Sequence, residues 1–267
     1  MAIITISRGT FSGGKLFAEA LSGRLGYRCI DRDELVERAA TPRATQRELR
    51  SAMEQPPAAP GRFNHKRYIY LAVIQAALLE EVRRGRAIFH GLAGQLLLRE
   101  VPGLLRLRII APMEFRIRMA QERLKLSAGA AVAHIEKMDQ DRRQWSHFLY
   151  GVDWGNPALY DLVINLEAIT IEQGCLMVAS LVEQGGFELT PERQAAMNDL
   201  ALASRVRAAV ATNPFTSNLE VDVRASGGAV SVRGDLYEES EDVQRVALAV
   251  PGVTGLTVEV PVTAGSA

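Results

Sequence analysis

The heptapeptide GTFSGGK, residues 9–15, joins a short β-branched run at residues 2–7 to a segment with helical apolar spacing at residues 15–25. It fits the pattern G-x-x-x-x-G-K. Glycines in this pattern let backbone N–H groups turn towards phosphate oxygens, and the helix N-terminus adds positive potential. Lys15 would reach a transferred phosphate. The strand-loop-helix context favours a phosphate-binding loop (P-loop) over a structural glycine turn.

The position after Lys15 departs from the full motif. A Ser or Thr there binds Mg²⁺ through its hydroxyl, whereas this chain has Leu16. Asp31 and Asp33, which follow the second predicted strand, are alternative holders of the metal, directly or through water. Solvated loop carboxylates are an equally weighted interpretation, and we assign no residue as a direct metal ligand.

The order strand, loop, helix, strand at the start of the chain predicts a parallel α/β sheet. A proline-rich segment, residues 41–64, is expected to be a poorly packed loop. Further strands are predicted at residues 27–30, 87–90, 104–110 and 162–166, and helices at residues 68–84, 112–125, 129–150 and 170–183. The expected class is α/β, with a parallel-sheet P-loop kinase-like domain over residues 1–188.

The character of the sequence changes after Gly185-Gly186. Residues 189–198 are predicted to be a linker, and residues 199–263 a small α+β domain. This domain is expected to contain helices at residues 200–210 and 241–250 and strands at residues 219–224, 229–233 and 256–262, with a hairpin turn at residues 226–228.

Bulk composition excludes several classes of protein. The 267 residues carry 31 Lys and Arg and 31 Asp and Glu, so no basic excess points to a nucleic-acid partner. Cys29 and Cys175 form no disulfide framework or metal-ligand spacing, and the four histidines form none either. The N-terminus has no signal-peptide pattern and the apolar runs are too short to span a membrane, so we expect a cytoplasmic protein.

Arginines cluster in the predicted helices late in the first domain: Arg116, Arg118, Arg123, Arg142 and Arg143. Phosphoryl transfer needs cations over the transferring group, because charge spreads onto its oxygens. For any single arginine, an ordinary charged helix face is an equally weighted alternative.

Five segments in this order carry a family resemblance: ISRGTFSGGK, YRCIDRDEL, LRLRIIAPMEFRIR, DQDRRQW and YGVDWGNPALYDLVINL. They resemble the cytidylate-kinase-like family, relatives of the P-loop nucleoside monophosphate kinases, over residues 1–188. The resemblance implies a parallel sheet flanked by helices. It also implies ATP- and Mg²⁺-dependent phosphoryl transfer to a nucleoside monophosphate, usually CMP or dCMP.

The resemblance also implies a set of site residues. Lys15, Arg116 and Arg142 would be catalytic. Asp31 and Arg32 would lie at the monophosphate acceptor, Arg118 on the helix that leads into the lid, and Asp139 in the D-x-x-R of the lid. Asp161 would lie near the acceptor nucleoside. The nucleotide-binding residues implied in all are Gly9, Ser12, Gly13, Gly14, Lys15, Asp31, Arg32, Arg118, Asp139 and Asp161.

Four departures from the family pattern bear on catalysis more than on nucleotide binding. One is the proline-rich stretch at residues 41–61, where the CMP kinases insert a monophosphate-binding domain. The common Gly-Arg-Gly after the third strand is replaced by Gly91-Leu92-Ala93-Gly94, which removes an arginine. Phe11 stands where relatives usually have a small residue, and Leu16 replaces the metal-binding hydroxyl.

The C-terminal region resembles a BON domain. The alternating strands, the pattern G-x-V-x-V-x-G at residues 228–234 and the Val-Pro-Gly-Val at residues 250–253 carry this resemblance. BON domains are small modules associated with phospholipid surfaces and with protein interaction. A generic packing domain is the alternative.

Three hypotheses on function follow. The first is an active kinase that uses ATP and a CMP-like monophosphate. The second is an inactive nucleotide sensor whose BON-like domain contacts a protein partner or a membrane surface. The third is an interaction protein with a vestigial P-loop. A nucleotide ligand is expected under the first two, and a homo-oligomer is left open.

Overall fold

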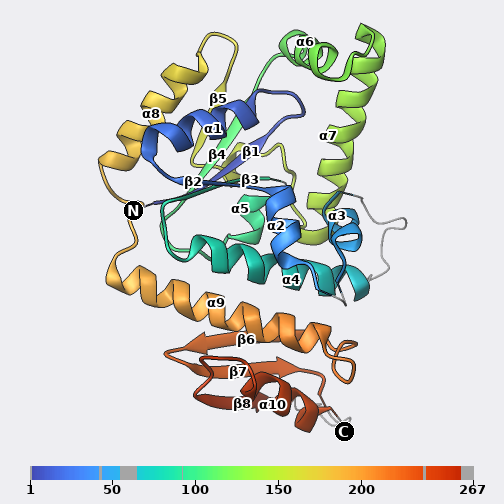
Figure 1. Cartoon of the computed structure of the whole chain (residues 1–267), viewed down its shortest axis with the longest axis vertical. Helices are drawn as coiled ribbons and strands as arrows, with labels where there is room; N and C mark the ends of the chain where they lie inside the picture. Colours follow the sequence, from blue (N-terminus) through green and yellow to red (C-terminus); the bar gives the residue numbers. More distant parts are fainter. Residues whose placement is uncertain (1, 42–43, 55–64, 92, 237–238, 260–267) are drawn as a thin grey trace, which may run out of the picture. The chain divides into compact units, whose positions relative to one another are not determined.

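A computed structural model of the chain describes residues 2–41, 44–54, 65–91, 93–236 and 239–259 (Figure 1). The chain divides into two compact units. The first consists of residues 1–35, 50–62 and 84–189, and the second of residues 36–49, 63–83 and 190–267. Each unit is described by itself below.

The first unit is built on a five-stranded parallel sheet with the order β2-β3-β1-β4-β5. Its strands are β1 (Ile3–Arg8), β2 (Arg28–Asp31), β3 (Ala87–His90), β4 (Leu104–Ile110) and β5 (Leu162–Asn165). Because β1 lies at the centre and is covered on both faces, its β-branched side chains are buried. The predicted α/β class with a parallel sheet is confirmed.

Helices of the first unit cover this sheet. α1 (Gly14–Leu25) and α8 (Ile171–Glu183) lie side by side (Figure 1). Phe17 and Leu21 of α1 and Val178 of α8 are fully buried with the strands in one apolar core. Other helices of this unit are α5 (Gly94–Leu97), packed on β1, α6 (Met113–Leu124), α7 (Ala128–Tyr150) and a 3₁₀ turn at Pro157–Leu159.

The second unit has a three-stranded mixed sheet with the order β6-β7-β8. β6 (Val221–Ser226) and β7 (Ala229–Gly234) are antiparallel, while β7 and β8 (Gly255–Glu259) are parallel. α9 (Pro191–Thr212) packs on β6, and α10 (Ser240–Leu248) packs on β8. The long helix α4 (His65–Val82) also belongs to this unit and runs alongside α9 (Figure 1).

Specific contacts fix α4 to the C-terminal part of this second unit. The Tyr68 hydroxyl donates to the Val221 carbonyl at 3.0 Å and accepts from the Val221 N–H at 3.3 Å. Arg205 of α9 lies 3.7 Å from Glu80 of α4. The second unit therefore combines an internal helix with the whole C-terminal region.

The expectation of a poorly packed loop over residues 41–64 was wrong in part. The segment contains α3 (Gln46–Glu54), preceded by a bridge between Thr41 and Ala44. The Thr45 N–H donates to the Glu48 carboxylate at 3.1 Å, and the Glu48 N–H donates to the Thr45 hydroxyl at 3.4 Å. This capping box starts the helix. Residues 42–43 and 55–64 lie outside the described part of the chain.

Residues 191–198, expected to be a linker, are helical. Thr190 caps α9 by accepting the Arg193 N–H at 3.3 Å, and Pro191 occupies the first turn, where a missing N–H costs nothing. The helix therefore starts about two turns earlier than the linker assignment implied. α2 (Arg32–Ala39), which the sequence did not predict, follows β2 directly.

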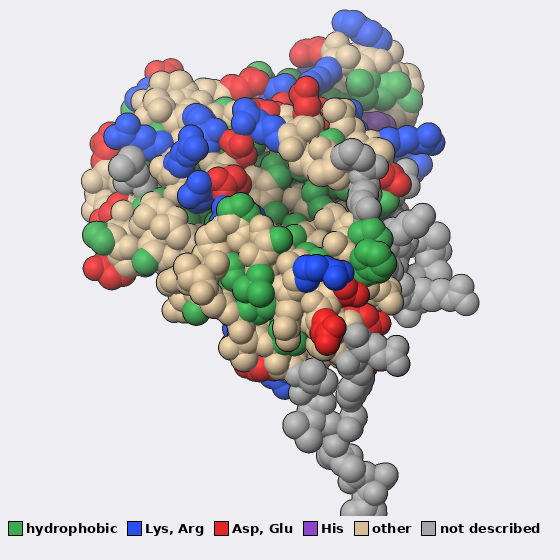
Figure 2. Space-filling view, turned by 60° about the horizontal axis from the view of Figure 1, so that its bottom comes forward, with side chains coloured by type: hydrophobic (Ala, Val, Ile, Leu, Met, Phe, Trp, Pro, Cys, Tyr) green, Lys and Arg blue, Asp and Glu red, His purple; other side chains and the backbone are tan. Residues whose placement is uncertain are grey.

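No helix among the described residues is both long enough and apolar enough to cross a bilayer. On the face drawn in Figure 2, basic and acidic side chains are interspersed, with apolar side chains in small groups between them. This distribution agrees with the equal numbers of basic and acidic residues in the chain.

Candidate functional site

The glycine-rich loop follows β1 and leads into α1, as predicted. Gly13 occupies the N-cap position of α1 with φ of 82°, a left-handed conformation that glycine adopts without steric cost. Phe11 also has positive φ, 59°, which is unusual for a bulky residue. Strained backbone of this kind persists where the surrounding structure enforces it, and it clusters at functional sites.

The side chain of Phe11 explains how this strain is held. Its ring lies 6.0 Å from the ring of His134 on α7 and packs against the buried cluster of Ala120, Ala131 and Ile135. Phe11, which replaces the small residue usual at this position, therefore anchors the loop to α6 and α7.

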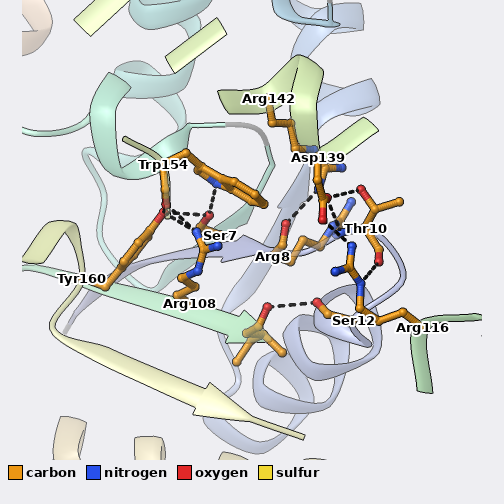
Figure 3. A network of polar contacts seen from close by, with 11 residues as sticks. Ser7, Arg8, Thr10, Ser12, Arg108, Arg116, Asp139, Arg142, Trp154 and Tyr160 are labelled. Atoms are coloured by element: carbon orange, nitrogen blue, oxygen red, sulfur yellow. Dashed lines mark hydrogen bonds and ion pairs between the residues drawn. The ribbon is translucent and has the colours of Figure 1, made fainter. Parts of the chain in front are cut away.

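Asp139 of α7 holds the loop in place from a second direction (Figure 3). Its Oδ1 accepts the Thr10 N–H at 3.1 Å and the Thr10 hydroxyl at 2.7 Å, and its Oδ2 pairs with Arg116. Arg116 Nε in turn donates to the Thr10 carbonyl at 2.7 Å. Burial alone would raise the pKa of Asp139, but the hydrogen bonds from Thr10 and Arg116 outweigh it and hold the pKa below its usual value.

A cleft of about 390 Å³ opens over this loop. Its cations come from the end of β1 and from four helices, and they outnumber the carboxylates Asp31, Asp33 and Asp141. Anions are therefore favoured in this cleft. The cationic side chains that line it are Arg8, Lys15, Arg32, Arg123 and Arg142.

Arg8 and His90 form the floor of the cleft. Arg8 Nη1 donates to His90 Nδ1 at 2.8 Å, so the imidazole is neutral and carries its proton on Nε2. Burial and the nearby Arg8 charge lower the pKa of His90 to about 4. Arg8 has no carboxylate within ion-pair distance among the described residues, and burial and then Arg32 and Arg123 lower its pKa. Its guanidinium is therefore placed to pair with an anion bound in the cleft.

The loop geometry depends on Arg8 as well. A Cβ atom at Gly14 would lie 2.6 Å from Cβ of Arg8, closer than any real contact. Gly14 therefore leaves room for the Arg8 side chain to cross the start of α1 into the cleft.

Arg142 of α7 closes the same side of the cleft. Its Nη1 donates to the Arg8 carbonyl at 2.9 Å, and its guanidinium lies 5.8 Å from the Trp154 ring centroid. Burial, offset by Asp139, lowers the pKa of Arg142 to about 10, so it stays a cation at neutral pH.

A buried polar network positions Trp154 at the cleft wall (Figure 3). The indole Nε1 donates to the Ser7 hydroxyl at 2.9 Å, and the Trp154 carbonyl accepts from Arg108 at 2.6 Å and from the Tyr160 hydroxyl at 2.9 Å. The segment after α7 is thereby fixed to the ends of β1 and β4.

These features combine a strained glycine loop, a helix N-terminus and a basic cleft at the carboxyl edge of a parallel sheet, where α/β proteins bind ligands. A family model described as the cytidylate kinase-like family matches residues 3–168, more than half of the chain. The chain belongs to the cytidylate kinase-like family. Its fold is accordingly kinase-like and of the nucleotide-binding type.

Individual proteins match this chain over a short stretch or at low sequence identity. A curated protein named uronate isomerase, from Corynebacterium glutamicum, is 34% identical over 96 residues, which are 36% of this chain and 18% of that protein. The chain thus matches less than a fifth of that relative's length. The crystal structure of an uncharacterized protein from Eubacterium ventriosum shares the fold, with a TM-score of 0.53 at 17% identity, covering 69% of this chain and 100% of that one.

A shikimate kinase from Bacteroides thetaiotaomicron matches with a TM-score of 0.44 and 13% identity, covering 68% of this chain and 98% of that one.

Within this cytidylate kinase-like site, most predicted residues gather around the cleft. Those that line it are Gly9, Ser12, Gly13, Gly14, Lys15, Asp31, Arg32 and Arg142. The Ser12 hydroxyl, however, is buried and donates to the Ile109 carbonyl at 2.9 Å, and the Ser12 N–H donates to the Gly9 carbonyl at 3.1 Å, so both donors of this residue are engaged within the protein. Lys15 Nζ lies 3.7 Å from Glu19 at the cleft surface.

Four predicted residues lie elsewhere. Arg116 and Asp139 stand behind the loop and support it through Thr10. Arg118 is exposed on α6 and lies outside the residues that line the cleft. Asp161 precedes β5 and pairs with Arg106, at 2.7 Å between Oδ1 and Nη2. Asp161 therefore lies at the amino edge of the sheet, away from the loop.

Several cleft residues were missed by the sequence-based prediction: Arg8, His90, Arg123 and Trp154. Arg8 and His90 are the last residues of β1 and β3. Because parallel strands end at the same edge of a sheet, their strand-terminal positions were the available signal. Arg123 was predicted only as a member of the arginine cluster.

Two of the departures from the family pattern, Leu16 and Leu92, differ in what the structure describes of them. Leu16 is 48% exposed and provides no oxygen at the position of the usual metal-binding hydroxyl. Leu92 lies outside the described residues. Among the described residues, no group of three metal-ligating side chains comes together.

Proposed function

We propose that this chain transfers a phosphoryl group from ATP to a nucleoside monophosphate of the CMP type. The observation that carries the proposal is the convergence of Lys15, Arg8, Arg123 and Arg142 on one cleft above the strained loop. Cations fixed in this way stabilise the charge that spreads over a transferring phosphoryl group, at no reorganisation cost during the reaction.

Two sides of the cleft suit the two substrates. The loop and the start of α1 would take the phosphates of ATP through backbone N–H groups and Lys15. Asp31 and Arg32, at the end of β2, would lie at the acceptor. The volume of about 390 Å³ is within the usual range of about 300–1,000 Å³ for small-molecule sites.

The residues present would suit Mg²⁺ in one arrangement. Mg²⁺ keeps several waters and takes one or two carboxylates besides substrate phosphates. Asp31 and Asp33 line the cleft and would supply these carboxylates. The N–H of Glu34 holds the pKa of Asp31 below its usual value, so this carboxylate is ionised at neutral pH. Bound Mg²⁺ would neutralise charge on the ATP phosphates.

The test is an ADP-release assay with ATP and Mg²⁺ against CMP, dCMP, AMP and UMP. We expect turnover with a cytidine monophosphate and a loss of about 100-fold or more in kcat for Lys15→Ala. Lys137→Ala, an exposed lysine on α7 outside the cleft, is the matched control and should keep full activity. Wild-type turnover no higher than that of Lys15→Ala contradicts the proposal.

A second candidate function is that of a nucleotide sensor without catalysis. Leu16 favours the sensor, because its exposed apolar side chain stands where the full motif has a metal-binding hydroxyl. Isothermal calorimetry separates the two: binding of ATP with no ADP release supports a sensor, and measurable phosphoryl transfer removes it.

For the C-terminal region we propose a BON-like domain over residues 199–263. The element order α9-β6-β7-α10-β8 and the mixed sheet support this assignment. We further propose that this domain contacts a protein partner or a phospholipid surface. The proposal also includes homo-oligomer formation and a cytoplasmic location. Flotation of the full chain with anionic phosphatidylglycerol vesicles tests the lipid contact, which a failure to float would contradict.

A further inference from the structure

A second cavity lies beside the first glycine of the loop. It has a volume of about 180 Å³ and shares Gly9 and Trp154 with the cleft. The end of β4, the start of α6, α7 and the segment after α7 all contribute to its wall. We name it the arginine pocket after its cationic side chains, Arg108, Arg116 and Arg143.

Arg108 is the unusual member of this pocket. It is 9% exposed, and its guanidinium lies 4.1 Å from the Trp154 ring centroid and 5.2 Å from that of Tyr160. Only Nη1 is engaged in hydrogen bonds, to the Trp154 carbonyl and the Tyr160 hydroxyl. Within the described part of the chain, Nε and Nη2 have no hydrogen-bond partner and no carboxylate pairs with the group.

The environment of Arg108 leaves its charge uncompensated. A buried cation is costly unless it is paired with an anion. Aromatic faces and neutral oxygens stabilise a guanidinium only in part. The unused Nε and Nη2 edge of Arg108 could take two oxygens of an anion side by side, the geometry in which arginine binds phosphate most strongly.

The other charges of the pocket reinforce this preference. Three guanidinium groups face one carboxylate, Asp139, so the lining carries a net charge of +2. Both Asp139 oxygens are already occupied, by Thr10 and by Arg116. Arg143 is exposed at the mouth of the pocket and has no ion pair among the described residues.

We infer that the arginine pocket binds a single tetrahedral oxyanion, phosphate or sulfate in type, between Arg108 and Arg143. Its volume of about 180 Å³ lies below the range of about 300–1,000 Å³ for whole small-molecule ligands, so a nucleoside does not fit. The oxyanion is either free orthophosphate or a phosphate group of a nucleotide that reaches past Gly9. The inference does not depend on the proposed kinase activity.

Crystals of the full chain soaked in sodium selenate test the inference directly, because selenium gives an anomalous signal. We expect an anomalous peak within hydrogen-bonding distance of Arg108 and Arg143. If the peak persists in crystals that also hold ATP, the ligand is a free oxyanion. If the ATP phosphates replace it, the ligand is the nucleotide's own phosphate. A peak over the loop but none in the arginine pocket overturns the inference.

Solution binding provides a second readout. Orthophosphate should raise the melting temperature of the wild type through both cavities. Arg143→Gln, a surface change, should weaken binding in the pocket about tenfold, the effect of losing one charge-assisted hydrogen bond, and so reduce the rise. Arg118→Gln, an exposed arginine outside both cavities, should leave the rise unchanged. Equal rises in all three proteins contradict the inference.

Discussion

Asp139 and Asp161 show how one chemistry has different uses at the two edges of the parallel sheet. Both are carboxylates paired with an arginine, and both were predicted to bind nucleotide. Asp139 pairs with Arg116 beside the loop, at the carboxyl edge. Asp161 pairs with Arg106 before β5, at the amino edge. Their surroundings differ: Asp139 fixes Thr10, whereas Asp161 fixes the start of two neighbouring strands.

The role of each carboxylate therefore follows from the edge of the sheet at which it lies. Strands of a parallel sheet present their last residues to the ligand side. A carboxylate that precedes a strand therefore stabilises the sheet, and one that faces the loop shapes the binding site. Five variants test this division.

Asp139→Ala should have the largest effect. It leaves Arg116 as a buried charge without its partner, and breaking such a pair costs about 3 kcal/mol of unfolding free energy. Because Thr10 also loses its anchor, we expect ATP affinity to fall by at least about tenfold. Urea unfolding and calorimetry measure the two effects. Unchanged ATP affinity would show that Asp139 supports the fold alone.

His90 should make the stability of the carboxyl edge depend on pH. Its pKa is about 4 in the folded protein, against about 6.5 unfolded, so the unfolded chain binds more protons between these values. The contribution of His90 is thus complete above pH 6.5 and is lost as the pH falls towards 4. Between pH 7 and pH 5 we expect a loss of about 2 kcal/mol.

Urea unfolding at the two pH values measures this loss. In His90→Gln, which keeps an acceptor for Arg8, the difference between the two pH values should shrink by the same amount. An equal pH dependence in wild type and variant would show that another group is responsible.

Arg123→Gln and Arg118→Gln are a matched pair on α6. Both arginines are exposed, but Arg123 lines the cleft and Arg118 does not. We expect Arg123→Gln to weaken ATP affinity about tenfold, through the loss of one charge-assisted contact, and Arg118→Gln to change it less than about twofold. Calorimetry with ATP measures both. Equal losses of ATP affinity in the two variants would mean that the arginines act through long-range electrostatic attraction and not through a direct contact.

Asp161→Ala should have the smallest effect, confined to stability. Its partner Arg106 is 37% exposed, and solvent screens the pair, so we expect a loss of about 1 kcal/mol. ATP affinity should stay within about twofold of the wild type. A tenfold loss of affinity on calorimetry would place Asp161 in the binding site after all.

The sequence predicted the sheet and its loop well because local patterns determine them. Continuous β-branched runs and glycine punctuation identified the strands of the parallel sheet and the start of α1. The helix α3 was not predicted because the prolines near it indicate a loop, although the capping box of Thr45 and Glu48 is a helix start signal. Thr190 and Pro191 are a similar start signal for α9.

The site was predicted less completely because it depends on which strands are neighbours. That Arg8 and His90 meet follows from the pairing of β1 with β3, which no local pattern encodes. Asp161 is a different case. Its place before a strand was visible in the sequence, and that place alone indicates the amino edge of the sheet.

The membership of α4 in the second unit has a consequence for how the gene can be divided. Residues 63–83 are encoded between parts of the first unit, yet they pack with the region after residue 190. A stop codon after residue 188 would strip α4 of its partner α9, together with the Tyr68–Val221 contact. Truncation at this point would therefore expose the surface of α4 that packs on α9.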